Sequence, residues 1–374
     1  MSETRLVGTE PEIRISADSH MAEPFDLWEK RMPENLRDRA QRYPNLRYGQ
    51  GLHAREGGRN PAVRLQDMAA DGISAEVLYP TLGKDMYRRG YDAELAEASA
   101  HAYNDWMIEF CQEAPDRFWG QAEICLWNID LAIREMERAK ENRLVGATIW
   151  MIAPDDLPFT SDHYDRFWAA AQDLEMPVSM HINQGFGPYA IGPYGLQRAP
   201  TFVEAVSSTC GGHKTIIMQT LTELMCSGVF ERYPRLKLVV AELEVGWIPF
   251  WLEDMDRRWL KSKGHEQFSL LPSEYFHRQI YATFTQDEVG GFLLQKYGAD
   301  NFMWSNDYPH PGCIWPYSDE VIDLTLSELS TEVRAKVLRE NVAQLYGMRI
   351  PAPMPRQAPP DMDRVWPRPW IRKE

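Results

Sequence analysis

Short apolar runs that alternate with longer amphipathic stretches constrain the fold of this chain more than any other feature. The runs comprise residues 13–17, 75–79, 120–125, 147–152, 178–181, 236–241, 280–284 and 302–305. The amphipathic stretches, which we predict to be helices, comprise residues 94–111, 129–142, 161–173, 214–226, 249–259, 289–295 and 331–346. This alternation is typical of parallel sheets built from βα units. Eight units in one chain predict an α/β fold of the (β/α)₈ TIM-barrel type rather than an open sheet.

Two segments interrupt this alternation, so we predict one barrel domain over residues 1–350 with two additions. Residues 31–63 are rich in Arg, Pro, Asn and Gly and form an insertion after the first strand. The insertion is either a lid over the barrel mouth or an ordered excursion. Residues 351–374 form a Pro-rich extension whose Trp366 and Trp370 suggest packing on the barrel or on a second subunit.

Composition excludes several classes of partner. Of 374 residues, 44% are hydrophobic, which is enough for a sizeable core, and the net charge is -15. An excess of acidic side chains repels nucleic acid and anionic lipid. The sequence lacks a long apolar span and begins without a signal-peptide pattern, so we expect a cytoplasmic protein without a membrane partner. The five cysteines show no CxxC spacing, which favours reduced thiols.

The end of the first predicted strand carries an acid and a histidine two residues apart. Side chains alternate along a strand, so Asp18 and His20 point to the same side. At the C-terminal end of a barrel strand, that side faces the active-site mouth. Such a pair can bind one divalent metal, although the pair alone is weak evidence.

Later strands end in further residues of the types that bind metals. The fifth predicted strand ends at His181, and Asp307 follows the eighth. His181 by itself could equally be a buried core histidine. Ligand-type residues at the same end of strands one, five and eight nevertheless converge in a barrel, and together they predict a metal site.

Several spaced motifs give the chain a resemblance to a known family. They are residues 18–24 (DSHMAEP), 64–68 (RLQDM), 71–73 (DGI), 103–106 (YNDW), 228–234 (GVFERYP), 246–249 (GWIP) and 305–310 (SNDYPH). From about residue 13 to 348, the chain resembles the second amidohydrolase family, which is also called the aminocarboxymuconate-semialdehyde decarboxylase-like group of the amidohydrolase superfamily.

The resemblance implies a distorted barrel with one divalent metal ion, usually zinc and sometimes manganese. By position, it implies that Asp18, His20, His181 and Asp307 bind the metal. The family often has Glu or His in place of Asp18, a change that zinc tolerates. Relatives with two metals use a carboxylated lysine on the fourth strand, and residues 147–152 contain no lysine, which favours a single ion.

The sixth strand departs from the pattern that the resemblance implies. Decarboxylases of the family commonly have a catalytic histidine there, whereas this chain has Glu242. A carboxylate can relay a proton or orient water but cannot donate positive charge. Alternatively, Glu242 is a buried acid paired with an arginine or with the metal-site network. His213 is a candidate for the missing imidazole, or else an exposed histidine at a helix start.

Other residues have both a functional and a structural interpretation. His310 either supports Asp307 from behind or packs in a proline-framed turn. Arg64, which we place just before a helix, either binds the substrate carboxylate or pairs with nearby protein groups. Aromatic side chains near the expected mouth either bind a flat substrate or fill the barrel, and they include Trp150, Trp247 and Tyr308 together with Tyr79, Trp127, Phe186, Trp304 and Trp315.

These features predict a metal-dependent enzyme that acts on a small aromatic or conjugated carboxylic acid. In a non-oxidative decarboxylation, Asp307 delivers a proton to the ring carbon; in hydrolysis of a lactone, amide or C–C bond, it takes a proton from water. The resemblance favours decarboxylation, and Glu242 favours hydrolysis. A non-catalytic ligand-binding barrel is the third alternative. The family further suggests a homodimer.

Overall fold

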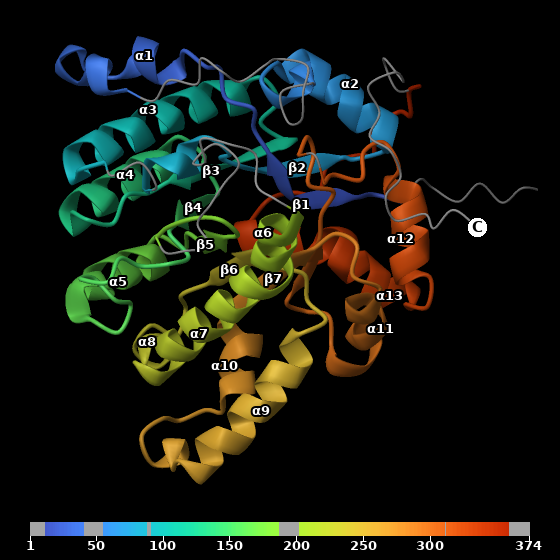
Figure 1. The fold of residues 1–374 in the computed structure, drawn as a ribbon. Helices are drawn as coiled ribbons and strands as arrows, with labels where there is room; N and C mark the ends of the chain where they lie inside the picture. Colours follow the sequence, from blue (N-terminus) through green and yellow to red (C-terminus); the bar gives the residue numbers. More distant parts are fainter. Residues whose placement is uncertain (1–11, 41–54, 88–90, 187–201, 311, 359–374) are drawn as a thin grey trace, which may run out of the picture.

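The chain forms a parallel eight-stranded barrel in a computed structural model that describes residues 12–40, 55–87, 91–186, 202–310 and 312–358 (Figure 1). Each strand pairs with the next one in sequence, from the first to the eighth. The strands are β1 (Ile15–His20), β2 (Ala75–Tyr79), β3 (Phe118–Glu123), β4 (Gly146–Ile149), β5 (Val178–His181), β6 (Leu238–Ala241), β7 (Ile280–Phe284) and β8 (Phe302–Trp304). The predicted TIM barrel is confirmed.

The segment that follows β8 joins the two ends of the sheet. The backbone N–H of Asp307 donates to the carbonyl of Asp18 over 3.1 Å, and that of His20 donates to the carbonyl of Tyr308 over 2.6 Å. The N–H of Asn306 donates to Ser16 Oγ over 3.0 Å. The barrel is therefore nearly closed, and the closure brings Asp307 beside β1.

The predicted bounds of the first strand were wrong. We predicted residues 13–17, whereas β1 runs from Ile15 to His20 and contains both Asp18 and His20. Its pairing with β2 shifts register between Ser16 and Ser19. Hydrogen bonds from the segment after β8 extend the strand into residues that the apolar pattern leaves out. β3 likewise ends two residues before the end of its predicted run, and β4 ends three residues before the end of its run.

Helices lie around the outside of the strands (Figure 1). They are α1 (Leu27–Arg31), α2 (Pro61–Asp71), α3 (Ala93–Gln112), α4 (Ile129–Glu141), α5 (Asp165–Asp173), α6 (Phe202–Ser207), α7 (His213–Cys226), α8 (Val229–Arg232), α9 (Ile248–Lys261), α10 (Pro272–Gln279), α11 (Glu288–Tyr297), α12 (Ser318–Leu326), α13 (Thr331–Ala335) and α14 (Asn341–Tyr346). The π-helical turn η8 (Lys336–Glu340) connects α13 to α14, so the last predicted helix forms with a bulge.

Helix α2 begins inside the predicted insertion, and its ends follow from three residues. The Asn60 side chain caps the first turn, Pro61 occupies the start, and Gly72 ends the helix with a φ of 70°. Arg64 therefore lies within this helix and not before it, which corrects our prediction.

Only parts of the two predicted additions lie within the described residues. Residues 41–54 of the insertion fall outside them, so the lid interpretation stays a prediction. The described start of the tail packs on the barrel domain, because Gln357 N–H donates to the Ala69 carbonyl over 3.3 Å and Arg356 donates to that of Ala70 over 3.2 Å. Trp366 and Trp370 lie outside the described residues. In the described ranges, each helix is too short or too polar to cross a bilayer.

Candidate metal centre

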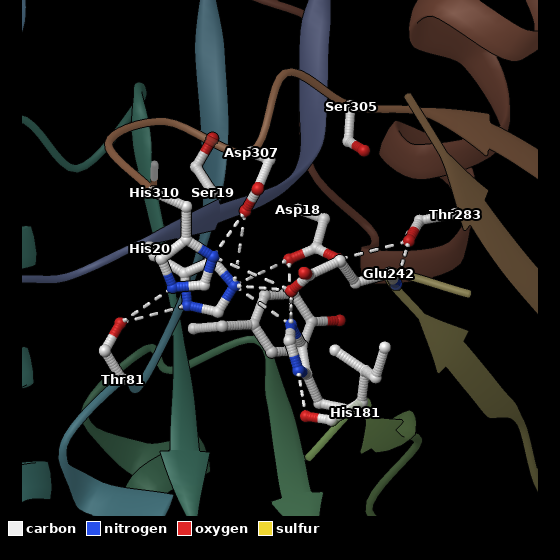
Figure 2. Close-up of polar contacts among 12 residues, drawn as sticks. Asp18, Ser19, His20, Thr81, His181, Glu242, Thr283, Ser305, Asp307 and His310 are labelled. Atoms are coloured by element: carbon white, nitrogen blue, oxygen red, sulfur yellow. Dashed lines mark hydrogen bonds and ion pairs between the residues drawn. The ribbon is translucent and has the colours of Figure 1, made fainter. Parts of the chain in front are cut away.

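Two buried imidazole rings face each other at the C-terminal ends of β1 and β5. The Nε2 atoms of His20 and His181 are 3.0 Å apart, and the rings meet edge to face at 89° (Figure 2). Asp18 Oδ1 lies 3.5 Å from the first of these nitrogens and 3.4 Å from the second. Asp18 and His20 therefore lie on the same side of β1, as their spacing in the sequence predicts.

Two further carboxylates reach the same point from the segments after β6 and β8. Glu242 Oε2 lies 3.2 Å from His181 Nε2 and 3.5 Å from His20 Nε2, and Asp307 Oδ1 lies 3.7 Å from His20 Nε2. Both acids have left-handed backbones, with φ of 59° for Glu242 and 56° for Asp307. This conformation is uncommon outside glycine and is concentrated at functional sites. Figure 2 shows both side chains directed toward the two imidazoles.

The oxygens at the centre of this cluster lack hydrogen-bond donors. Asp18 Oδ1, Glu242 Oε2 and Asp307 Oδ1 are all buried and accept no hydrogen bond among the described residues, although the last lies 2.7 Å from His310 Nδ1 in an ion-pair contact. A buried polar atom without a partner costs about 1–3 kcal/mol, and more when it is charged. A cation between these oxygens and the two Nε2 atoms removes that cost, so the residues present fit a divalent metal ion.

Burial shifts the pKa values of the cluster toward the uncharged forms. It raises the pKa of Asp18 and that of Glu242 to about 7, and that of Asp307 well above its usual range. It lowers the pKa of His181 to about 3 and that of His20 well below its usual range. Both histidines are therefore neutral and have the lone pairs that metal binding requires.

Contacts behind the cluster orient its ligands. His20 Nδ1 lies 3.2 Å from the Pro80 carbonyl, and His181 Nδ1 lies 2.9 Å from the Ile182 carbonyl. An N–H at each Nδ1 leaves each Nε2 free to bind a metal. The Thr283 hydroxyl donates to Asp18 Oδ2 over 3.1 Å, which leaves Oδ1 directed at the histidines.

His310 lies against both Asp307 and His20, as the support interpretation predicts. Its Nδ1 is 2.7 Å from Asp307 Oδ1, and its ring stacks on that of His20 with centroids 3.6 Å apart. Burial lowers the pKa of His310 to about 4. Its nitrogen is also near enough to the other donors to belong to a group of metal-ligand type.

Comparison with known proteins places this chain in a family. The family model described as amidohydrolase matches residues 51–348. The chain belongs to the amidohydrolase family. A gamma-resorcylate decarboxylase from Rhodococcus jostii is 28% identical over 356 residues, which cover 89% of this chain and 98% of that protein. Another from Polaromonas sp. is 27% identical over 270 residues, 66% of this chain and 76% of that protein.

Solved structures share the barrel. The 5-carboxyvanillate decarboxylase LigW from Sphingomonas paucimobilis matches with a TM-score of 0.67 and 22% identity, over 90% of this chain and 99% of that one. A dihydroxybenzoic acid decarboxylase from Polaromonas sp., with bound manganese and 2-nitroresorcinol, matches with a TM-score of 0.64 and 22% identity, over 90% and 97% of the two chains. These likenesses establish the amidohydrolase barrel fold.

Lys84 is a member of the site of this amidohydrolase that our sequence analysis missed. It lies on the 3₁₀ turn η4 (Gly83–Tyr87) after β2, is 5% exposed, and has its Nζ 3.0 Å from His181 Nδ1. A single lysine in a loop has no periodicity or spacing that marks it. Its position after the second strand of a barrel was the one available signal.

Two predicted site residues of the amidohydrolase lie apart from the cluster. His213 begins α7, is 1% exposed and has Nδ1 3.4 Å from Ser208 Oγ, so the alternative of an exposed histidine is wrong. It belongs to neither group of metal-ligand type among the described residues. Arg64 is fully buried and donates to Glu76 and, over 2.8 Å, to the His20 carbonyl. These contacts are those of its structural interpretation.

The three predicted aromatic substrate contacts occupy different places. Trp150 is fully buried in a group of aromatic rings near η4. Trp247 donates from its indole N–H to the Leu243 and Glu244 carbonyls, both over 3.0 Å, in the turn after β6. Tyr308 directs its hydroxyl to Asp67 and packs against Trp315. The side-chain contacts of Tyr308 are therefore with Asp67 and Trp315 and not with the metal cluster.

Proposed function

We propose that this amidohydrolase is a metal-dependent carboxy-lyase that removes CO₂ from a small aromatic carboxylic acid without oxidation. The observation that carries the proposal is the convergence of three buried carboxylate oxygens, from Asp18, Glu242 and Asp307, on the Nε2 atoms of His20 and His181. Relatives that align over nearly their full length are gamma-resorcylate decarboxylases.

The same cluster defines the proposed cofactor. Asp18, His20, His181 and Asp307 would hold one divalent ion, with Glu242 as a further oxygen ligand. Carboxylates suit manganese and imidazoles suit zinc, so this mixed set accepts either. When bound, such an ion supplies a Lewis acid that orients the substrate oxygens and stabilises negative charge.

Asp307 is the proposed proton donor. Burial and the neighbouring Asp18 raise the pKa of Asp307, which favours its protonated form. In the reaction, Asp307 would take up a proton from water and deliver it to the ring carbon that bears the carboxylate. The bond between that carbon and the carboxylate then breaks, its electron pair returns to the ring, and CO₂ leaves. His310, 2.7 Å away, holds the Asp307 carboxylate in place.

Glu242 favours hydrolysis as the second candidate. A carboxylate 3.2 Å from His181 Nε2 lies where the resemblance implies a histidine, and it can accept a proton from water. In that reaction, Glu242 or Asp307 acts as the base and the substrate is a lactone, an amide or a C–C bond. The two reactions use the same set of residues.

Product analysis distinguishes the two candidates. Metal-loaded protein is incubated with 2,6-dihydroxybenzoate and 5-carboxyvanillate, and separately with aromatic lactones and amides. We expect CO₂ release from the acids and about a 10²–10⁴-fold loss of rate in Asp307→Asn. Asp300→Asn on the surface serves as the matched control. Turnover of the lactones and amides alone would reject decarboxylation.

We also propose that the protein is a homodimer. The support is the family expectation, together with Trp366 and Trp370 of the Pro-rich tail, which lie outside the described residues; the described start of the tail contacts its own barrel domain through Arg356 and Gln357.

A further inference from the structure

Lys84 is held in a fixed position beside the proposed metal centre. The backbone N–H groups of Leu82 and Gly83, which precede it, donate to the buried carboxylate of Glu23 over 3.0 and 3.2 Å. At the other end of η4, the Tyr87 hydroxyl donates to Glu123 Oε1 over 2.9 Å. The turn is therefore anchored on both sides of the lysine, and its ammonium is confined near His181.

The contact between Lys84 and His181 is incompatible with a metal at His181 Nε2. A neutral imidazole that binds a metal through Nε2 carries its hydrogen on Nδ1. That N–H donates to the Ile182 carbonyl, which lies 2.9 Å away. An ammonium group cannot donate to the same nitrogen, so in the metal-bound protein Lys84 loses this acceptor while its anchored turn keeps it nearby.

The charge of the cluster requires a cation for an anionic substrate to bind. Three ionised carboxylates exceed the charge of one divalent ion by one, so an incoming carboxylate meets a net negative site. Lys84 offsets this excess. Its charge opposes the rise that burial causes in the pKa of Asp18, Glu242 and Asp307, and it acts in the same way on the buried Glu123.

Aromatic rings flank the same turn. Tyr87 contacts Trp127, Trp150 and Phe186 with ring centroids 5.8, 5.5 and 5.9 Å apart. Trp127 and Phe186 are the partly exposed members of this group and offer apolar surface on which a flat substrate can stack, beside a cation that can hold its acidic group. The cation that would hold the acidic group and the rings that would stack on the substrate therefore lie on the same side of the metal cluster.

We propose that Lys84 is the residue that selects anionic aromatic substrates, by binding the substrate carboxylate next to the metal in the loaded protein. This inference rests on the proposed function and adds the source of its preference for acids. Lys84 is then a substrate-binding residue, and its loss affects binding of charged ligands far more than binding of neutral ones.

The test compares a charged ligand with its neutral counterpart. Calorimetric titration of manganese-loaded protein with 2,6-dihydroxybenzoate and with 2,6-dihydroxybenzamide gives two dissociation constants for each variant. We expect wild type to prefer the acid, and Lys84→Met to lose about 10- to 100-fold in affinity for the acid with little change for the amide. Lys84→Arg restores part of the preference. Lys263→Met, at a lysine whose side chain is 71% exposed, gives the same change in net charge and keeps the preference.

Manganese content and thermal melting of each variant show whether the centre and the fold survive. An equal loss of affinity for both ligands in Lys84→Met, or an unchanged preference for the acid, would overturn the inference. A lost preference in Lys84→Met, with no CO₂ released by wild type, would support the role of Lys84 while rejecting the proposed reaction. The two proposals therefore fail separately.

Discussion

The backbone of Glu242 and Asp307 explains how acids on two loops reach one point. Both have a positive φ, which directs their side chains to the histidines of β1 and β5. The sequence marked Asp307 through its position after a strand and through family resemblance. It left the role of Glu242 open, because a carboxylate stands where the resemblance implies a histidine and can either relay a proton or orient water. The missing hydrogen-bond partner of Glu242 Oε2 was visible only in three dimensions.

Replacement of His310 tests whether it supports the acid. His310→Gln removes the Nδ1 that lies 2.7 Å from Asp307 Oδ1 and the ring that stacks on His20. We expect a loss of about 10- to 100-fold in metal affinity or in turnover, as is usual for groups behind a metal ligand. Metal titration and initial rates measure the two effects. His265→Gln in the turn after α9 is the control, and equal behaviour of the two variants would contradict the supporting role.

The raised pKa of Glu242 predicts a pH-dependent stability in the metal-free protein. Its pKa rises from 4.5 to about 7 on folding, so between these values the folded state binds more protons than the unfolded state. The free energy of unfolding therefore falls as the pH rises through this window. Glu242→Gln lacks this contribution.

We expect metal-free wild type to lose stability relative to Glu242→Gln between about pH 5 and 8, measured by urea unfolding at each pH. A difference between the two proteins that does not change with pH would count against a buried Glu242.

At the scale of elements, the ion pair between α2 and β2 explains the burial of Arg64. Its guanidinium pairs with Glu76 and also contacts the His20 carbonyl, so it connects α2 to β1 and β2. Arg64→Met leaves Glu76 buried without its partner, and such a loss costs about 3–5 kcal/mol of unfolding free energy.

The double variant Arg64→Met with Glu76→Met removes both charges and should recover part of that stability, as urea unfolding would show. If Arg64→Met instead kept wild-type stability and raised KM alone, the substrate-binding interpretation of Arg64 would be correct.

How well we predicted each strand and helix depends on the interactions that determine where it begins and ends. β2, β5 and β7 match the predicted runs because nearly all of their positions are buried, which selects mostly apolar residues along each strand. β1 extends into Asp18 and His20 because of hydrogen bonds from a segment far away in the sequence. α2 carried readable signals in Asn60, Pro61 and Gly72, but we assigned Asn60 and Pro61 to the insertion and placed the helix after Arg64.

At the scale of the whole molecule, the order of eight βα units sufficed to predict the barrel. The metal centre draws on β1, β5 and the segments after β6 and β8, and the general rule that barrel active sites lie at the C-terminal ends of strands brought these together. That rule did not lead us to Lys84, because the conformation of a loop decides which of its residues face the site. The predicted lid over residues 41–54 stays a prediction.

Light scattering tests the proposed homodimer and the role of the tail. We expect twice the mass of one chain for the full protein. If residues 351–374 contribute to the interface, their deletion shifts the mass toward that of one chain at micromolar concentration. Circular dichroism of the shortened protein controls for folding. A mass of one chain both with and without the tail would refute the dimer.

We propose that the protein holds a single divalent ion, with ligands on β1 and β5 and in the segments after β6 and β8. An anomalous difference map at the manganese absorption edge, from crystals of the manganese-loaded protein, measures this directly. We expect one peak within bonding distance of the Nε2 atoms of His20 and His181 and of Oδ1 of Asp18. The peak should be absent in His181→Ala. A peak elsewhere, or two peaks at this site, would contradict it.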